Sequence, residues 1–312
     1  MMQLLKIGVV TAAMLVPSVA MSQVDYPVDS VRIFVPANPG GGTDATARIF
    51  AEFFQTHSDA SVAIINQPAG GGVVAAQSVV QGDQDGSVLF FFHAALHTAN
   101  LFGNSPYAWD SFTPLATISE INDVYAVRAD APYSTIDELI AYAQENPGEI
   151  NIGSQLGGTT QVKGEAINQA AGGSMRIVDA GTETDRITAL LGGQVEVISM
   201  SVANALQYVE DGQIKVLALM NETPDPAAPE FPTTVSQGLD FSLPLVMTVY
   251  GPPEVDEAVI AAFDEIVANI RADPEFLQVL NNQAQVPALR GPAEASEFLR
   301  NEYDIISGLL NQ

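Results

Sequence analysis

The stretch "VPANPGGGTDATARIFAEFF", residues 35–54, joins a short apolar run to an amphipathic segment through three consecutive glycines. Large apolar side chains of the second segment fall on one helical face: Ile49, Phe50, Phe53 and Phe54. The order of strand, glycine loop and helix predicts a βα unit. Glycine loses more backbone freedom on folding than any other residue, so the glycines at 40–42 need a structural or functional reason.

The same alternation continues along the chain. Predicted strands are 31–35, 62–66, 88–92, 124–128, 150–154, 176–179, 195–200 and 215–220. Helical patterns lie between them, and the segment 135–146 opens with Thr135 and Glu138 at the spacing of a capping box. Strands that alternate with helices predict an α/β fold with mostly parallel sheets.

The C-terminal part of the chain has a different pattern of apolar residues. From residue 255 onward the pattern becomes helical, with predicted helices at 255–271, 274–282 and 293–310. Five prolines between residues 221 and 244 predict a long surface connection that contributes little to a core.

Residues 1–22 predict a signal peptide. Lys6 supplies a positive charge, residues 7–19 form an apolar stretch, and residues 20–22 match a small-x-small cleavage site. No later apolar run reaches the ~18 residues of a spanning helix, so we expect an exported chain without stable membrane insertion. The sequence has no cysteine, which excludes disulfides, thiolate metal ligands and cysteine nucleophiles.

The charge balance is strongly acidic. Eleven basic residues face 37 acidic ones, for a net charge of −26. Nucleic acids and anionic membranes need a basic partner surface, so neither is an expected partner. The acidic residues are spread along the chain without a long run, which indicates a solvated surface and suggests a saline habitat.

Phosphate and metal chemistry find little support in the motifs. A nucleotide loop needs G-x-x-x-x-G-K-[ST], but Thr43 and Asp44 follow the glycines at 40–42, and two valines follow a second triplet at 70–72. Neither a G-x-S-x-G elbow nor an H-E-x-x-H motif is present. His93 and His97 have a spacing that suits a metal, but no third ligand can be identified nearby, so structural or cleft-lining roles are expected. The sequence therefore predicts no cofactor, no metal and no catalytic residue.

A second loop repeats the layout of the first. In "INIGSQLGGTTQVKGEAINQAAG", residues 150–172, a strand runs into Gly157-Gly158, then Thr159-Thr160, then a helix. Glycines allow close backbone approach, and a helix start offers unpaired N–H groups, so each loop can bind an anion without a basic side chain. The alternative for each is a plain strand-to-helix turn. The two alternating blocks of strands and helices fit two α/β lobes, and one such loop on each lobe predicts a carboxylate clamp.

Several motifs in this order carry a resemblance to a known family. They are Tyr26-Pro27 followed by "VRIFVPANPGGGTDATAR", "NQPAGGGVVAA" (66–76), "DGSVLFF" (85–91), "INIGSQLGGTT" (150–160), "LLGGQVEV" (190–197), "VEDGQIKVLAL" (209–219) and "PEFPTTVSQGL" (229–239). Together they resemble the extracytoplasmic solute receptors of the tripartite tricarboxylate transporters, the TctC or Bug family.

The resemblance implies a type II periplasmic-binding-protein fold, with two α/β lobes, two crossing hinge strands and a helical C-terminal tail that packs back on lobe 1. The implied boundaries are 23–123 and 245–312 for lobe 1 and 124–244 for lobe 2. The crossings are expected near residues 119–124 and 245–251.

The resemblance also implies the residues that bind a ligand carboxylate. They are Pro39, Gly41, Gly42, Thr43 and Asp44 in the first loop, Ser154, Gly158, Thr159 and Thr160 in the second, and Asp179 and Ser201 at the flanks of the cleft. The charge of Asp44 opposes a carboxylate, so we expect this side chain to cap helix N–H groups, order a water or meet a ligand ammonium.

Three segments depart from the family pattern. Residues 180–182 stand where many relatives carry Tyr-Lys-Gly, residues 161–163 replace a frequent His, and residues 200–201 replace an Asp-Asn pair. The far end of the ligand is therefore expected to be recognised differently, and a tricarboxylate is disfavoured. Lys163 or Arg186 is the alternative source of a positive charge, but both are expected on the surface.

The resemblance thus implies a monomeric periplasmic receptor, not an enzyme, that delivers a small carboxylate to a membrane permease. Two alternatives stay open. One is a secreted hydrolase or lyase that uses Asp44, Asp179, Glu183 or His93, and the other is a receptor that feeds a membrane sensor.

Overall fold

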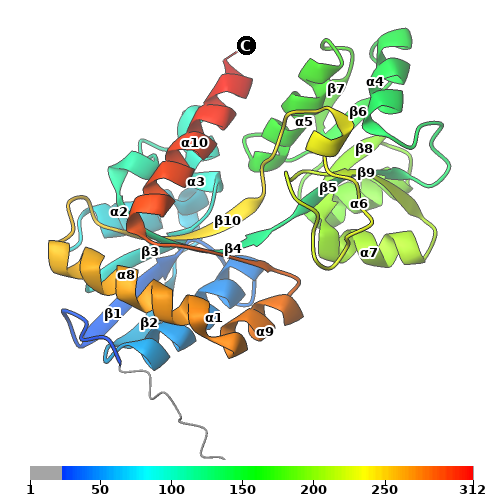
Figure 1. Cartoon of the computed structure of the whole chain (residues 1–312). Coiled ribbons are helices and arrows are strands. Elements are labelled where there is room, and N and C mark those ends of the chain that lie inside the picture. The colour runs from blue at the N-terminus through cyan, green and yellow to red at the C-terminus, as the bar shows by residue number, and fades with distance from the viewer. Residues whose placement is uncertain (1–22, 312) are drawn as a thin grey trace, which may run out of the picture.

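The computed structural model describes residues 23–311, so the predicted signal peptide lies outside the described residues. Two β-sheets, each with its own helices, form two lobes that lie side by side (Figure 1). Within the described residues, no helix is both long enough and apolar enough to cross a membrane.

Lobe 1 is built on a six-stranded sheet with the order β11-β4-β10-β3-β1-β2. Its strands are β1 (Ser30–Val35), β2 (Ser61–Asn66), β3 (Val88–Phe92), β4 (Thr113–Ile121), β10 (Leu245–Gly251) and β11 (Val286–Arg290). One face is covered by α1 (Gly42–His57), α8 (Glu257–Ala272) and α9 (Pro274–Asn282). The other face is covered by α2 (Val73–Val80), α3 (Ala95–Leu101) and α10 (Pro292–Leu310). The apolar stripe predicted for α1 forms this core, because Phe50 stacks on Phe91 and Phe54 packs against Phe263.

Lobe 2 is built on a five-stranded sheet with the order β7-β6-β8-β5-β9. Its strands are β5 (Asp123–Arg128), β6 (Asn151–Ser154), β7 (Arg176–Asp179), β8 (Val197–Ser201) and β9 (Ile214–Leu219). The helices α4 (Ile136–Glu145) and α5 (Thr159–Ala170) cover one face, and α6 (Glu183–Leu191) and α7 (Val202–Glu210) cover the other. The predicted cap of α4 is present, since the Thr135 hydroxyl accepts a hydrogen bond from the Glu138 amide.

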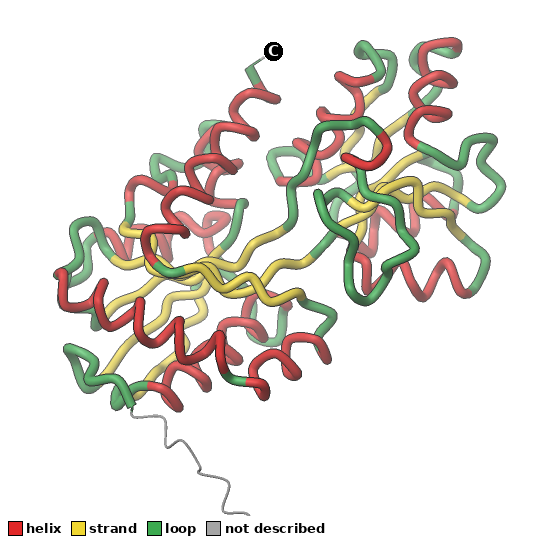
Figure 2. The backbone as a smooth tube through the Cα atoms, viewed as in Figure 1, coloured by secondary structure: helices red, strands yellow, loops and turns green. Residues whose placement is uncertain are grey.

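Two strands cross between the lobes. Asn122 alone separates β4 of the first sheet from β5 of the second, and β10 pairs antiparallel with β4 on the way back (Figure 2). The two α/β lobes, the crossing strands and the C-terminal helix agree with the predicted fold class. We propose that the lobe limits lie at these changes of sheet, close to the predicted residues 123 and 244.

The strand register shows which loops open between the lobes. Because β10 enters lobe 1 from the hinge and β3 runs antiparallel to it, the carboxyl end of β3 points toward lobe 2. The strand β1 is parallel to β3 and ends at the same edge. In lobe 2, Asp123 at the start of β5 lies opposite Ser201 at the end of β8, and β6 is parallel to β8. The loops after β1, β3, β6 and β8 therefore all face the interlobe space.

Three expectations about the fold were wrong. The sheets are mixed, not mostly parallel, because the strands at the hinge run against their neighbours. The C-terminal segment is not wholly helical, since β11 forms an edge strand beside β4, and its half-buried side chains give only a weak pattern. The proline-rich segment 221–244 is not a simple surface connection, because Phe231, Phe241 and Leu243 are buried.

The C-terminal helix α10 contacts both lobes. It lies on α3 and β4 of lobe 1, and its last turns reach α5 of lobe 2 (Figure 1). There Ile306 is fully buried in the lobe 2 core, and Gln169 Nε2 donates a 2.7 Å hydrogen bond to the Leu309 carbonyl. The helix was expected to pack back on lobe 1. It packs on lobe 1 and also joins the two lobes.

Candidate functional site

The first glycine loop ends in an open helix N-terminus. Gly40 has a φ of +84°, in the left-handed region that favours glycine. The helix α1 begins at Gly42 without a side-chain cap, and its first intrahelical hydrogen bond runs from the Ala45 amide to the Gly41 carbonyl. The amides of Gly42, Thr43 and Asp44 precede that bond, so this end of α1 offers N–H groups to an anion.

Asp44 braces this loop from inside. Its carboxylate is 2% exposed and accepts hydrogen bonds from the Gly40 amide at 2.8 Å, Arg48 Nε at 2.9 Å and Asn66 Nδ2 at 2.8 Å. Burial by itself would raise the pKa of Asp44, but the hydrogen bonds from these three partners outweigh it and lower the pKa to about 2. The side chain is therefore ionised and occupied, and it caps no amide of the helix.

The second loop has the same design. Gly157 has a φ of +77°, and α5 begins at Thr159 with Gly158 as its N-cap. The first hydrogen bond of this helix runs from the Gln161 amide to the Gly158 carbonyl, so the amides of Thr159 and Thr160 precede it. The loop is held in place by Gln161, whose side chain accepts a hydrogen bond from the Gly157 amide at 2.8 Å.

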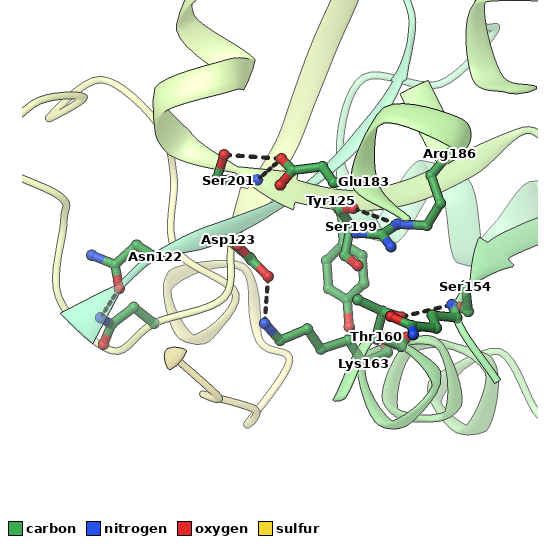
Figure 3. A network of polar contacts seen from close by, with 12 residues as sticks. Asn122, Asp123, Tyr125, Ser154, Thr160, Lys163, Glu183, Arg186, Ser199 and Ser201 are labelled. Carbon is green, nitrogen blue, oxygen red and sulfur yellow. Dashed lines mark hydrogen bonds and ion pairs between the residues drawn. The ribbon is translucent and has the colours of Figure 1, made fainter. Parts of the chain in front are cut away.

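Four of the predicted ligand-binding side chains mainly hold their own loops. Ser154 is fully buried and donates to the Thr160 carbonyl at 3.1 Å, and the Thr160 hydroxyl accepts from the Gln155 amide at 2.8 Å (Figure 3). Asp179 accepts from the amides of residues 156 and 181, both at 3.4 Å. Ser201 caps α7 through the Asn204 amide. Because these four side chains are occupied in this way, we propose that backbone amides are the main ligand donors of the two loops.

The lobe 2 wall of the interlobe space contains two buried cations, which were wrongly expected at the surface (Figure 3). Lys163 is 1% exposed, and its Nζ lies 2.5 Å from Asp123 Oδ2. Arg186 is 5% exposed and donates from Nε to the Ser199 carbonyl at 3.2 Å and from Nη1 to the Gly181 carbonyl at 3.0 Å. Burial lowers the pKa of Arg186. A buried charge is tolerated when it is paired and hydrogen-bonded, which is why both side chains can turn inward.

Asp123 and Asn66 were not predicted as site residues. Asp123 lies 40 positions before its partner Lys163, so no local pattern connects the two. Asn66 stands at the end of β2 within the matched motif 66–76, and a polar side chain at that strand end was the one signal available.

His93 and His97 have different surroundings. His93 follows β3 at the interlobe edge, and its Nδ1 accepts a hydrogen bond from the Ala95 amide at 3.2 Å. Burial, with the nearby charge of Lys163, lowers the pKa of His93 to about 4, so the ring is neutral at pH 7 and keeps its N–H on Nε2. His97 is fully buried, and its Nε2 lies 2.9 Å from Glu302 Oε2 of α10. Among residues 23–311, no three acidic or histidine side chains are placed to hold a metal ion.

A cavity of about 510 Å³ lies on the other side of the hinge. Glu120, Asn221, Arg290 and Phe298 are among its lining residues, and it includes no predicted site residue. The helix N-termini with unpaired amides lie on the side of β1, β3, β6 and β8, away from this cavity. We therefore place the candidate site between the two glycine loops.

Comparisons with known proteins agree with this architecture. The family model described as "Tripartite tricarboxylate transporter family receptor" matches residues 46–304. A UPF0065 protein of Bordetella pertussis is 27% identical over 301 residues, which cover 94% of this chain and 92% of that protein. A ligand-free TctC solute-binding protein from Polaromonas has a TM-score of 0.83 at 24% identity and covers 92% of this chain and 99% of its own.

A second solved structure carries a ligand. MatC from Rhodopseudomonas palustris, solved with bound malate, has a TM-score of 0.72 at 24% identity, with 92% of this chain and 100% of that chain covered. Together with the two crossing strands, these structures confirm the periplasmic-binding-protein fold.

Proposed function

Because this chain belongs to the tripartite tricarboxylate transporter receptor family, whose members are periplasmic solute-binding proteins, we propose that it captures a small organic carboxylate between its two lobes. In this proposal the exported chain acts in the periplasm as a monomer and hands the ligand to the permease of its transporter.

One observation carries the proposal: each lobe presents a glycine loop and an uncapped helix N-terminus to the same interlobe space. The first contributes the amides of residues 42–44 and the second those of residues 159–160. Each helix start carries roughly half a positive charge and unpaired N–H groups. A carboxylate between the two helices therefore accepts hydrogen bonds from both N-termini. Only the closed state lets one carboxylate contact both loops, so the ligand shifts the population toward closure.

Relatives support the ligand class. MatC, with the same fold, was solved with bound malate, which is a small dicarboxylate. The acidic surface of this chain, with a net charge of −26, also favours a site made from backbone dipoles over one that needs many basic side chains.

The hydrolase or lyase alternative loses two of its four candidates, Asp44 and Glu183. A general base needs a free carboxylate or imidazole within reach of its substrate. The carboxylate of Asp44 accepts three hydrogen bonds, and Glu183 Oε1 accepts from the Ser201 amide, the Ser201 hydroxyl and Asn204 Nδ2. Both side chains are occupied by structural contacts, which favours binding over turnover.

The proposal is tested with purified mature protein that has been unfolded, washed free of ligand and refolded. We expect some mono- or dicarboxylates of a broad panel to raise the melting temperature, because a ligand that binds the native state stabilises it. Intact recovery of the ligand after denaturation separates a receptor from an enzyme. A panel without any shift would contradict the proposal.

A further inference from the structure

The helices that face the interlobe space contain few cations. Within the described residues, α1, α5 and α6 each carry one lysine or arginine, namely Arg48, Lys163 and Arg186. The charge available to a second anionic group on the ligand depends on whether these three side chains are free.

Lys163 is the cation that follows the second glycine loop along α5. It lies four residues after Thr159, so it shares a face of α5 with the amides of the first turn. It also lies close enough to His93 of lobe 1 for its charge to affect that ring. Its ammonium group is nevertheless occupied, because Asp123 Oδ2 is 2.5 Å from Nζ and the side chain is 1% exposed.

The other two cations also have partners, and the side chain of one of them, Arg48, is 53% exposed. Arg186 donates to the carbonyls of Ser199 and Gly181, and Arg48 pairs with Asp44 at 2.9 Å and donates to Asn66 Oδ1 at 3.3 Å. An anionic group that approached Lys163 would therefore meet an ion pair of no net charge.

Negative groups add to this effect. Asp179 stands exposed at the end of β7, and Glu183 begins α6 on the same side of lobe 2. A second carboxylate on the ligand would lose its water in exchange for contacts with carboxylates, which is unfavourable. A neutral polar group, in contrast, can accept a hydrogen bond from the Nε2–H of His93. An ammonium group can pair with the carboxylate of Asp179 or Glu183.

The inference rests on the proposed function and specifies its ligand. We propose that the site selects a monocarboxylate whose other end is uncharged or cationic, and that the Lys163–Asp123 ion pair excludes dicarboxylates. The two helix N-termini hold the single carboxylate, and the ion pair denies a second one a free cation.

Three ligands of equal chain length test the selectivity: butanoate, 4-aminobutanoate and butanedioate (succinate). They end in a methyl, an ammonium and a carboxylate group. Calorimetric titration of the ligand-free protein should show at least one of the first two binding more tightly than succinate, by about tenfold or more. Tighter binding of succinate than of both others would overturn the inference and leave the proposed function standing. If no carboxylate of the wider panel binds, the proposed function fails and the inference fails with it.

The ion pair itself is tested by Asp123→Asn, which keeps the size of the side chain and frees the ammonium of Lys163. We expect the affinity for succinate, relative to the preferred monocarboxylate, to rise by about tenfold or more. Asp130→Asn is the matched control, because Asp130 also pairs with a cation, Arg128, but its side chain is 79% exposed. This control should leave the preference unchanged.

A second variant separates charge from fold. The double change Asp123→Asn with Lys163→Gln should abolish the gain for succinate, since no cation is left to meet the second carboxylate. Melting curves of the ligand-free variants show whether each one folds. An Asp123→Asn protein that folds and still discriminates against succinate as the parent does would overturn the role of the ion pair.

If Asp123→Asn does not fold, the single variant Lys163→Gln tests the role of the ion pair. It should still reject succinate, and a gain for succinate would overturn the inference.

Discussion

At the scale of single residues, Asp44 shows how the site can bind anions next to an acidic side chain. Its carboxylate is turned away from the loop surface and bonded to Gly40, Arg48 and Asn66. The negative charge therefore fixes the loop in place, with the amides of α1 directed outward. The burial of this one side chain decides whether the loop is preorganised.

We expect Asp44→Asn to lower the free energy of unfolding at pH 7 by about 1–3 kcal/mol, since a charged hydrogen-bond acceptor in a buried position is lost. Chemical unfolding of both proteins measures the difference. Asp130→Asn serves as the control, because its side chain is 79% exposed and its loss should change little. Equal stability of the Asp44 variant and its parent would contradict the bracing role.

The same residue predicts a pH dependence. The pKa of Asp44 is lowered from 3.8 to about 2 on folding, so its contribution is fully present above pH 3.8. It is lost as the pH falls toward 2, because the unfolded chain then binds a proton that the folded protein does not. The stability gap between the parent and Asp44→Asn should therefore narrow in unfolding experiments as the pH is lowered from 4 toward 2. A gap that stays constant over this range would contradict the lowered pKa.

At the scale of elements, the two helix starts are the proposed binding groups. Gly42 is the first residue of α1 and has no positive φ, and a Cβ at this position would meet no atom within 4 Å. A side chain there can therefore enter the interlobe space without straining the fold. Gly308 of α10 has the same two properties away from the loops.

We expect Gly42→Leu to weaken carboxylate binding by about tenfold or more, because the side chain covers the amides at the helix start. The melting temperature of the ligand-free protein should stay close to that of the parent. Gly308→Leu should bind as the parent does. Calorimetric titration of the three proteins gives the answer, and unimpaired binding by Gly42→Leu would remove the first loop from the site.

At the scale of the whole molecule, α10 couples the two lobes. It packs on lobe 1 along most of its length and buries Ile306 in the core of lobe 2, whereas the adjacent Ile305 is 45% exposed. Besides the two hinge strands, this helix gives the lobes a shared apolar contact. The lobes should therefore unfold together.

We expect Ile306→Ala to cost about 2–4 kcal/mol, as removal of a buried isoleucine usually does. Ile305→Ala should change the stability by no more than about 0.5 kcal/mol. The single tryptophan, Trp109, reports on lobe 1 by fluorescence, and circular dichroism reports on both lobes. The two probes should give coincident unfolding curves for the parent and separate curves for Ile306→Ala. Coincident curves with unchanged stability for Ile306→Ala would contradict the coupling.

Several features could be predicted because they depend on neighbours in the chain. The apolar face of α1, the cap at Thr135 and the two glycine loops depend on spacings of a few residues. Lys163 could not be placed in this way, because its partner Asp123 lies on β5, 40 residues earlier in the chain. The edge strand β11 was missed for a related reason, since it is defined by pairing with the distant β4.

The sequence by itself determined the βα alternation, the two loops and the family, because these features depend on the spacing and backbone preferences of residues that are close together in the chain. The tertiary structure alone decided which charges are free. The sequence shows that Lys163 and Arg186 carry positive charges, but only the structure shows that both are buried, against Asp123 and two backbone carbonyls. That outcome depends on long-range pairing and desolvation, which arise only when distant segments are packed together.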